Sequence, residues 1–268
     1  NLFTKKILDL NFGNSIQLIS IENNLIDEIY VNKIPKRKVF YSLVNKSVGE
    51  SHQSKINKIC NILKFKKVDH LFISSPENVA WLMNIRGHDN PTSPIPNCRL
   101  LINKSKKIFL IVDEKIATKI VNENKFQKNQ IINPRKFEKL INKLNGNKFI
   151  IDGLSCSILN KKIIKSKFDI IEEVDPCYML KSIKNPTEIK NTIKAHIEDG
   201  LALTRFIYWI KNVNKKQITE IEAKNKLQKF RKLSKNYLFP SFDTIAGAGS
   251  NGAIVHYRVS KKTNKIIN

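Results

Sequence analysis

Long apolar runs are missing from this 268-residue sequence. No stretch approaches the roughly 18 consecutive apolar residues that a membrane-spanning helix needs, and the first residues do not follow the order of a signal peptide. We therefore expect a protein that has no membrane segment and acts in the cytoplasm. An initiating Met is missing as well, because the chain opens at Asn1. We expect the chain to be an internal piece of a longer protein.

Cysteine is scarce, and no Cys-x-x-Cys pair occurs. The four cysteines are widely spaced, at Cys60, Cys98, Cys156 and Cys177. This spacing argues against both a zinc knuckle and a disulfide framework. It predicts four reduced and mostly buried thiols.

Arginine and acidic residues are also few. The chain has 48 Lys and Arg against 23 Asp and Glu, a net charge of +25, but only seven of the basic residues are Arg. Such a charge usually raises nucleic acid or an anionic membrane as the partner. Bidentate recognition of phosphates or bases favours Arg, however, and the lysines are spread along the chain without a basic block interleaved with aromatics. We expect a solvated lysine surface, with neither nucleic acid nor membrane as partner. Salt-dependent nucleic-acid binding stays open as an alternative.

Strand-like and helical patterns alternate from residue 38 to 175, which indicates an α/β domain with a mixed sheet. Residues 1–37, with an apolar run at 15–21 and a polar linker at 34–38, are predicted to be the tail of a preceding domain. The expected helices are 52–65, 77–83, 114–121 and 134–144. The expected strands are 70–73 and 149–152, with a hairpin formed by 99–102 and 107–112.

Residues 176–268 have a different pattern, typical of the start of an α+β domain. Asn185-Pro-Thr-Glu188 is a strong helix start, and the helix is expected to reach about Ile210. Thr219 and Glu222 form a capping box for a second helix, which runs to about Leu233. Two strands, 242–246 and 253–257, are predicted to follow around a glycine-rich loop.

The glycine-rich loop, Gly247-Ala-Gly-Ser-Asn-Gly252, is a weak phosphate-binding pattern. No Lys-Ser or Lys-Thr pair follows it, and a strand rather than a helix is expected next. It could instead form a tight hairpin or let the backbone approach a ligand closely. His256 comes at the end of the second strand, where a histidine on its own is more often structural than catalytic.

The run from Ser241 to Tyr257 resembles the entry to the catalytic domain of the Xaa-Pro aminopeptidases, metallopeptidases of family M24 with the pita-bread fold. Ser250 stands where that family usually has Pro. Four further segments resemble the family in the same order along the chain: 24–30, 73–87, 175–189 and 195–200. The resemblance therefore covers most of the chain.

This resemblance implies a bacterial three-domain enzyme that releases the N-terminal residue from peptides with proline at the second position. It further implies a homodimer. Residues 1–37 would end a first creatinase-like domain, 38–175 would form a second one, and 176–268 would begin the pita-bread domain. The family binds two Mn²⁺ ions through carboxylates and a His that follow the His-Tyr motif. We therefore expect every metal ligand beyond Asn268 and an inactive fragment.

Two substrate-binding residues are implied by the resemblance. His256 matches a family His that lines the cleft, where it could hydrogen-bond the scissile carbonyl or the developing oxyanion. Arg86 could clamp a peptide carboxylate or carbonyl, or else pair with Asp89 to stiffen its own loop. Tyr257 is expected in the core and Trp81 as a buried anchor. The alternative function is a non-catalytic pita-bread binding module, of the histone-chaperone kind or another scaffold.

Overall fold

The structure is a computed structural model, and it describes residues 3–13, 16–19, 25–29, 38–123, 125–213 and 217–267. The expected apolar run at 15–21 and linker at 34–38 lie partly outside these residues. Contacts divide the chain into two units, residues 1–185 and 186–268. Each unit is described by itself below, and the domain limits drawn from the sequence stay predictions.

A six-stranded mixed sheet forms the centre of residues 1–185, in the order β6-β5-β4-β2-β7-β8. β2 (His70–Ile73) pairs antiparallel with β4 (Arg99–Asn103) and parallel with β7 (Lys148–Ile151). β5 (Ile108–Ile111) lies between β4 and β6 (Ile131–Ile132), and β6 and β8 (Asp169–Glu172) form the two edges. This arrangement confirms the predicted α/β class with a mixed sheet.

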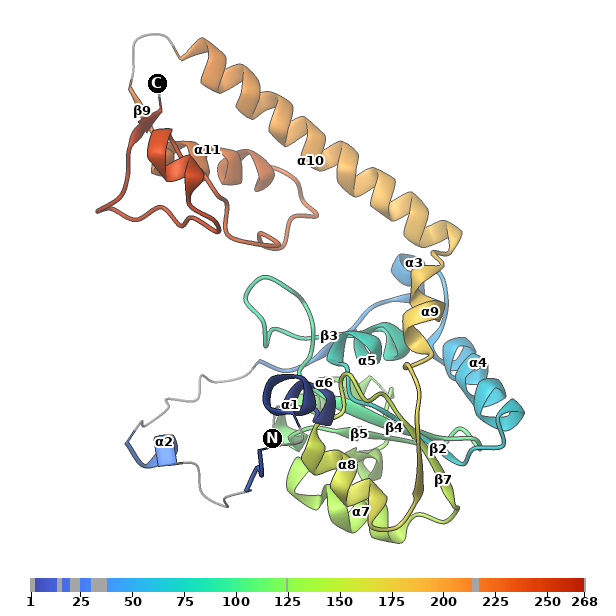
Figure 1. Cartoon of the computed structure of the whole chain (residues 1–268). Coiled ribbons are helices and arrows are strands. Elements are labelled where there is room, and N and C mark those ends of the chain that lie inside the picture. Colours follow the sequence, from blue (N-terminus) through green and yellow to red (C-terminus); the bar gives the residue numbers. More distant parts are fainter. Residues whose placement is uncertain are drawn as a thin grey trace. The chain divides into compact units, whose positions relative to one another are not determined.

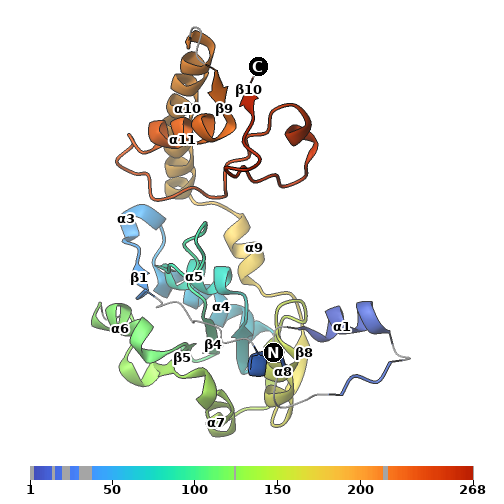
Figure 2. The same ribbon diagram turned by 90° about the vertical axis from the view of Figure 1, so that its left-hand side faces the viewer.

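Helices cover both faces of the sheet (Figures 1 and 2). α4 (His52–Phe65), α5 (Pro76–Met83) and α6 (Glu114–Asn122) contribute to one apolar cluster. α7 (Phe137–Lys143) and α8 (Ile158–Lys165) contribute to the other. Successive strand residues alternate between the two clusters, as with Leu71 and Ile73 on one face and Phe72 on the other. Strands buried on both faces read as continuous apolar runs, which explains why β5 is apolar throughout and β2 is apolar after His70.

The other elements of this unit are short. They are α1 (Lys5–Phe12), α2 (Leu25–Ile29), β1 (Tyr41–Ser42), α3 (Asn45–Val48), β3 (Ile85–Arg86), α9 (Cys177–Ser182) and the 3₁₀ turns η1 (Lys128–Gln130) and η2 (Pro134–Lys136). All four cysteines lie in this unit and are buried, as predicted, and none of them forms a disulfide.

Most predicted elements of this unit are confirmed within two residues. The predicted helix 52–65 is α4 itself, and the predicted strand 70–73 is β2 itself. The predicted helix 134–144 divides into η2 and α7, because Pro134 and the side chain of Asn133 begin a tighter turn first. The prediction missed α8, whose sequence is mixed with lysine, and β8, whose two apolar residues lie between two acidic ones.

Residues 186–268 begin with the long helix α10 (Pro186–Asn212). The chain continues through β9 (Ile218–Thr219), α11 (Glu220–Arg231), the 3₁₀ turn η3 (Gly249–Ala253) and β10 (Ile266–Ile267). β9 and β10 pair antiparallel beside α11 (Figure 2). Thr219 and Glu222 form the predicted capping box. Arg231 joins α11 to α10 through two hydrogen bonds to Asp199, of 2.6 and 3.0 Å.

One expectation for this unit does not hold. The predicted strands 242–246 and 253–257 are wrong, since residues 242–248 contain no strand and η3 with a turn occupies 249–256. On α10, the apolar residues Ile193, Ile197 and Leu201 are between 52% and 67% exposed. None of the described helices is long and apolar enough to cross a membrane.

Two apolar residues in the last turn of α4 are predicted to contribute very differently to the unfolding free energy. Leu63 is fully buried and Phe65 is 89% exposed. Leu63→Ala should cost about 2–5 kcal/mol of unfolding free energy, because it removes buried apolar surface and leaves a cavity. Phe65→Ala, the matched control, should change the unfolding free energy by less than about 0.5 kcal/mol. Denaturant unfolding followed by circular dichroism measures both, and equal losses would contradict the assigned packing.

Candidate functional site

Arg86 and His256 belong to different units, so each segment is described by itself. Arg86 follows α5, which ends at Asn84 in the left-handed conformation, with φ of 52°. β3 then pairs antiparallel with β1, with Arg86 opposite Tyr41. Ile85 is fully buried while Arg86 is half-buried. The strand therefore anchors one residue in the core and leaves the next partly accessible.

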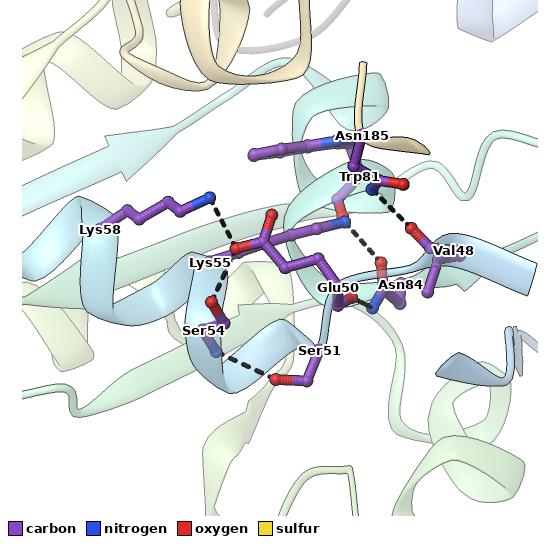
Figure 3. A network of polar contacts seen from close by, with 9 residues as sticks. All are labelled: Val48, Glu50, Ser51, Ser54, Lys55, Lys58, Trp81, Asn84 and Asn185. Carbon is purple, nitrogen blue, oxygen red and sulfur yellow. Dashed lines mark hydrogen bonds and ion pairs between the residues drawn. The ribbon is translucent and has the colours of Figure 1, made fainter. Parts of the chain in front are cut away.

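A buried lysine fixes the backbone just before Arg86 (Figure 3). Lys55 of α4 is 1% exposed. Its Nζ donates hydrogen bonds to the carbonyl oxygen of Trp81 (2.9 Å) and to Oδ1 of Asn84 (2.7 Å). The ammonium also lies 4.4 Å from the centre of the Trp81 ring. A buried charge needs such partners, so Lys55 ties α4 firmly to the end of α5.

The same network extends to two neighbouring segments (Figure 3). Asn84 Nδ2 donates to the carbonyl oxygen of Glu50 (2.8 Å), and Asn185 Nδ2 donates to that of Val48 (2.8 Å). Burial raises the pKa of the Glu50 carboxyl, but hydrogen bonds from Lys58 and Ser54 outweigh it and lower the pKa overall. The network thus joins four stretches of chain around Asn84.

The Arg86 guanidinium is turned partly toward its own backbone. Nη1 donates to the carbonyl oxygens of Ala80 (3.0 Å) and Ile85 (2.8 Å). In the loop that follows, Asp89 accepts a hydrogen bond from the Asn97 N–H (2.7 Å), and the His88 ring lies 5.4 Å from the Tyr41 ring. Trp81, expected as a buried anchor, is half-buried and packs against the core.

The loop begins at Gly87, where a second stretch of backbone lies too close to leave room for a side chain. A Cβ atom on Gly87 would lie 2.7 Å from Cα of Pro96. The loop returns at this point, where the Gly87 N–H donates to the carbonyl oxygen of Pro94 (3.0 Å). Only glycine allows this close approach of two backbones directly after Arg86.

In the second unit, the fully buried carboxylate of Glu220 organises the segment that contains His256. It accepts hydrogen bonds from the backbone N–H groups of Ala248 (2.6 Å) and Lys265 (3.1 Å). Asn251 Nδ2 (3.0 Å) and the Tyr257 hydroxyl (2.9 Å) also donate to it. The Glu220 side chain therefore binds the glycine-rich loop at Ala248 and Asn251, and it also binds Tyr257 and the residue before β10.

These hydrogen bonds decide the protonation of Glu220. Burial works to raise the pKa of its carboxyl, but the donors from Ala248, Asn251, Tyr257 and Lys265 together lower it to about 2. The pKa of the Tyr257 hydroxyl is raised instead. Burial and the nearby Glu220 charge raise this pKa, and a hydrogen bond with Thr263 lowers it by less. The pair is thus a carboxylate and a neutral phenol at neutral pH.

The Glu220 contacts explain why the predicted strand 253–257 is wrong. Asn251 and Tyr257 are six residues apart, yet Nδ2 of one lies 2.8 Å from the hydroxyl of the other. Six extended residues would span roughly 20 Å. The chain must therefore turn back, and it does so with His256 in the left-handed conformation, with φ of 54°.

His256 lies between an exposed and a buried neighbour. Its own side chain is exposed, Val255 is 83% exposed, and Tyr257 is 5% exposed. The expectation that Tyr257 belongs to the core is confirmed. Of the residues singled out from the motif, Asn251 and Tyr257 bind Glu220, while the imidazole of His256 faces outward. The outward imidazole is the group in this segment that an added ligand could reach.

The part of the chain that the structure describes contains no group of three or more His, Cys, Asp or Glu residues able to hold a metal ion. Its residues therefore do not fit a two-metal centre. Sequence reasoning also missed Lys55 and Glu220. Glu220 directly follows the helix-capping Thr219, where an acidic residue usually complements the helix dipole. Lys55 lies on an otherwise ordinary lysine-bearing helix, and nothing local marks either residue as buried.

Comparison with known proteins gives this architecture a family. Residues 32–188 match the family model described as the creatinase/prolidase N-terminal domain. The chain belongs to this family. Residues 190–268 match the model of metallopeptidase family M24. The resemblance that the motifs indicated is thus confirmed for both parts of the chain.

Curated relatives agree with this assignment. The chain is 32% identical to the Xaa-Pro aminopeptidase ApepP of Drosophila melanogaster, over 94% of this chain and 42% of the fly protein. It is 30% identical to Xaa-Pro aminopeptidase 1 of Dictyostelium discoideum, over 98% of this chain and 43% of that protein. The chain therefore spans less than half the length of these relatives. Both are eukaryotic, and the assignment to a bacterial type stays a prediction.

Solved structures share the fold. An X-prolyl aminopeptidase from Caenorhabditis elegans, described as a cytosolic enzyme with a di-nuclear active site, superposes with a TM-score of 0.82 at 24% identity. The match covers 93% of this chain and 42% of that one. A Xaa-Pro dipeptidase from Bacillus anthracis superposes with a TM-score of 0.57 at 20% identity, over 81% of this chain and 58% of that one.

The depressed pKa of Glu220 predicts how its contribution to stability depends on pH. Its folded-state pKa of about 2 lies below the ordinary value of 4.5. The contribution is therefore complete above about pH 4.5 and is lost as the pH falls through about 2. Glu220→Gln should lower the unfolding temperature at pH 7, because an amide NH₂ then meets backbone N–H donors.

The difference in unfolding temperature between wild type and Glu220→Gln should shrink as the pH falls from 4.5 toward 2. Thermal unfolding across this pH range measures it. Asp243→Asn is the control, because Asp243 forms a long and exposed ion pair with Arg258, at 3.6 Å, and such pairs contribute little. A Glu220→Gln difference that stays constant with pH would contradict the assigned charge.

Proposed function

We propose that this chain is part of a Xaa-Pro aminopeptidase, which hydrolyses the bond between an N-terminal residue and a following proline. The observation that carries the proposal is the pair of Xaa-Pro aminopeptidase relatives, each matched over more than nine-tenths of this chain. Proline forms a tertiary amide with no N–H and a fixed backbone angle, so a dedicated site is needed to cleave before it. The substrates are peptides with proline second.

His256 is proposed to bind the substrate at the bond that is cleaved. An imidazole N–H can donate to the scissile carbonyl oxygen, and this hydrogen bond strengthens as negative charge develops on that oxygen. The outward side chain of His256 supports this role, as does the support of both flanks by Glu220. A donor held in place before the reaction costs little reorganisation during it.

Arg86 is proposed to bind the peptide through its half-buried guanidinium. The hydrogen bonds from Nη1 to the carbonyl oxygens of Ala80 and Ile85 hold this side chain in place. The planar guanidinium fork matches the geometry of a peptide carboxylate or carbonyl. The Lys55 and Asn84 contacts would then orient the strand that presents Arg86.

The metal centre is proposed to consist of two Mn²⁺ ions held by residues outside this chain. Two observations support this placement: the described residues lack a suitable ligand group, and the chain spans less than half of its relatives. On this proposal the chain alone does not hydrolyse peptides. The resemblance supports a cytoplasmic homodimer that engages neither nucleic acid nor membrane, and the nematode neighbour is described as cytosolic.

The role of His256 predicts a loss of activity without a loss of fold. In the full-length protein, Mn²⁺-dependent cleavage of a Xaa-Pro peptide should fall by about 100-fold or more in kcat/KM for His256→Asn. Asn tolerates the left-handed backbone found at this position, so the segment should keep its shape. His196→Asn, at an exposed position of α10, is the control and should retain activity.

Activity unchanged in His256→Asn would remove His256 from the proposal. A folded full-length protein that cleaves no Xaa-Pro peptide with Mn²⁺ would refute the peptidase function itself. In that case the binding-module function becomes the working hypothesis.

The role of Arg86 predicts a change in substrate binding. Arg86→Lys keeps the charge but loses the planar fork, so KM should rise about tenfold while kcat changes less than about threefold. Arg135→Lys, at an exposed position, should leave both constants unchanged. Steady-state kinetics with a Xaa-Pro peptide separates the two constants. An unchanged KM combined with a lowered unfolding temperature would show that Arg86 only supports its own backbone.

A further inference from the structure

Four lysines converge on one open hollow in residues 1–185. Lys64 lies in the last turn of α4, and Lys67 follows that helix. Lys104 and Lys106 flank Ser105 in the turn between β4 and β5. These five residues line a space of about 620 Å³. The lysines come from two separate parts of the sequence, which is why the spread of lysine along the chain did not predict a cluster.

Among the residues that the structure describes, one of these four lysines forms an ion pair. Lys104 Nζ lies 2.7 Å from Oδ1 of Asp69. Hydrogen bonds from Lys104 and from the N–H groups of Asn147 and Lys148 hold the pKa of the Asp69 carboxyl well below its usual range. That carboxylate is therefore fully engaged. Within the described residues, Lys64, Lys67 and Lys106 form no ion pair, so three positive charges stay uncompensated.

The chemistry of the lining favours an anion. Four ammonium groups and one hydroxyl surround the space, and no carboxylate lines it. Ammonium groups donate hydrogen bonds and accept none. A monovalent anion would neutralise only one of the three charges. An anion with several negative charges within a few ångströms could neutralise them together, and linked phosphate groups have this property.

Two of the lysines occupy backbone conformations that favour glycine. Lys67 has φ of 55° and Lys106 has φ of 68°. At Lys67, backbone hydrogen bonds from Lys67 to Lys64 and from Val68 to Leu63 close the end of α4. Glycine is the preferred residue at such a helix end. A lysine at this position costs conformational energy, and its side chain is exposed.

The hairpin turn gives the second case. Asn103 Oδ1 accepts hydrogen bonds from the N–H groups of Ser105 (3.0 Å) and Lys107 (2.8 Å). These bonds fix the turn, in which Lys106 has a left-handed backbone conformation. Sparsely populated backbone conformations concentrate at ligand sites, so an observed outlier is a reason to look for a ligand. Here two outliers line the same hollow and both carry uncompensated charges.

We propose that this hollow binds a small soluble anion that carries two or more phosphate groups. The site is separate from the proposed peptidase function and does not depend on it. The charges of Lys64, Lys67 and Lys106 provide the attraction. The ordered backbone of the helix end and of the hairpin turn sets their positions.

The left-handed backbone provides a test that does not disturb the fold. In the variant Lys67→Gly/Lys106→Gly, two charges are removed and glycine is placed where it fits better, so the unfolding temperature should stay level or rise. Isothermal titration of the EDTA-treated full-length protein with inorganic tripolyphosphate, at about 0.1 M salt, should give a Kd at least tenfold weaker for this variant. Lys64→Gln should weaken binding in the same direction.

The matched control is Lys139→Ala/Lys143→Ala on the exposed face of α7, which removes the same charge from another surface. Its Kd should stay within twofold of wild type. The proposal is overturned if wild type does not bind tripolyphosphate, or if both double variants weaken it equally. It is also overturned if the hollow lysines affect binding only to anionic lipid vesicles or to RNA.

Discussion

The burial of β2 on both of its faces is the constraint on which the first unit depends. Leu71 and Ile73 belong to one apolar cluster and Phe72 to the other, so helices must cover the sheet on both sides. Within the strands of this sheet, polar and charged side chains are then confined to the strand ends. Arg86 follows a helix end, and the four lysines gather at another helix end and a hairpin turn. The apolar sheet thus limits where polar side chains that could bind a ligand can lie.

Two buried charges show how this placement is made rigid. Lys55 and Glu220 lie in different units, and each collects hydrogen bonds from several stretches of chain. Because a buried charge without partners is costly, each charge fixes the segments that supply its partners. One of those segments leads into Arg86 and the other contains His256. The backbone that carries Arg86 or His256 is therefore fixed by the buried charge next to it.

The sequence predicted local structure well and long-range polar contacts poorly. The helix 52–65 has apolar residues at helical spacing, and this signal is contained within one short segment. The strand predicted at 253–257 also has a local apolar pattern. The contacts that override it link Glu220 to residues 28 to 45 positions away, and no local pattern contains them. The role of Lys55 is hidden for the same reason, since its acceptors are 26 and 29 residues distant.

Backbone conformation links the three regions of interest more directly than sequence pattern does. Within the described ranges, four residues other than glycine have a positive φ: Lys67, Asn84, Lys106 and His256. Asn tolerates this conformation, and at Asn84 the Lys55 contact also stabilises it. His256 is held there by the Glu220 contacts of its neighbours. The hydrogen bonds around Lys67 and Lys106 explain their backbone conformation, yet they do not require lysine, because glycine would satisfy them at lower cost. The identity of these two side chains is therefore better explained by a ligand than by folding.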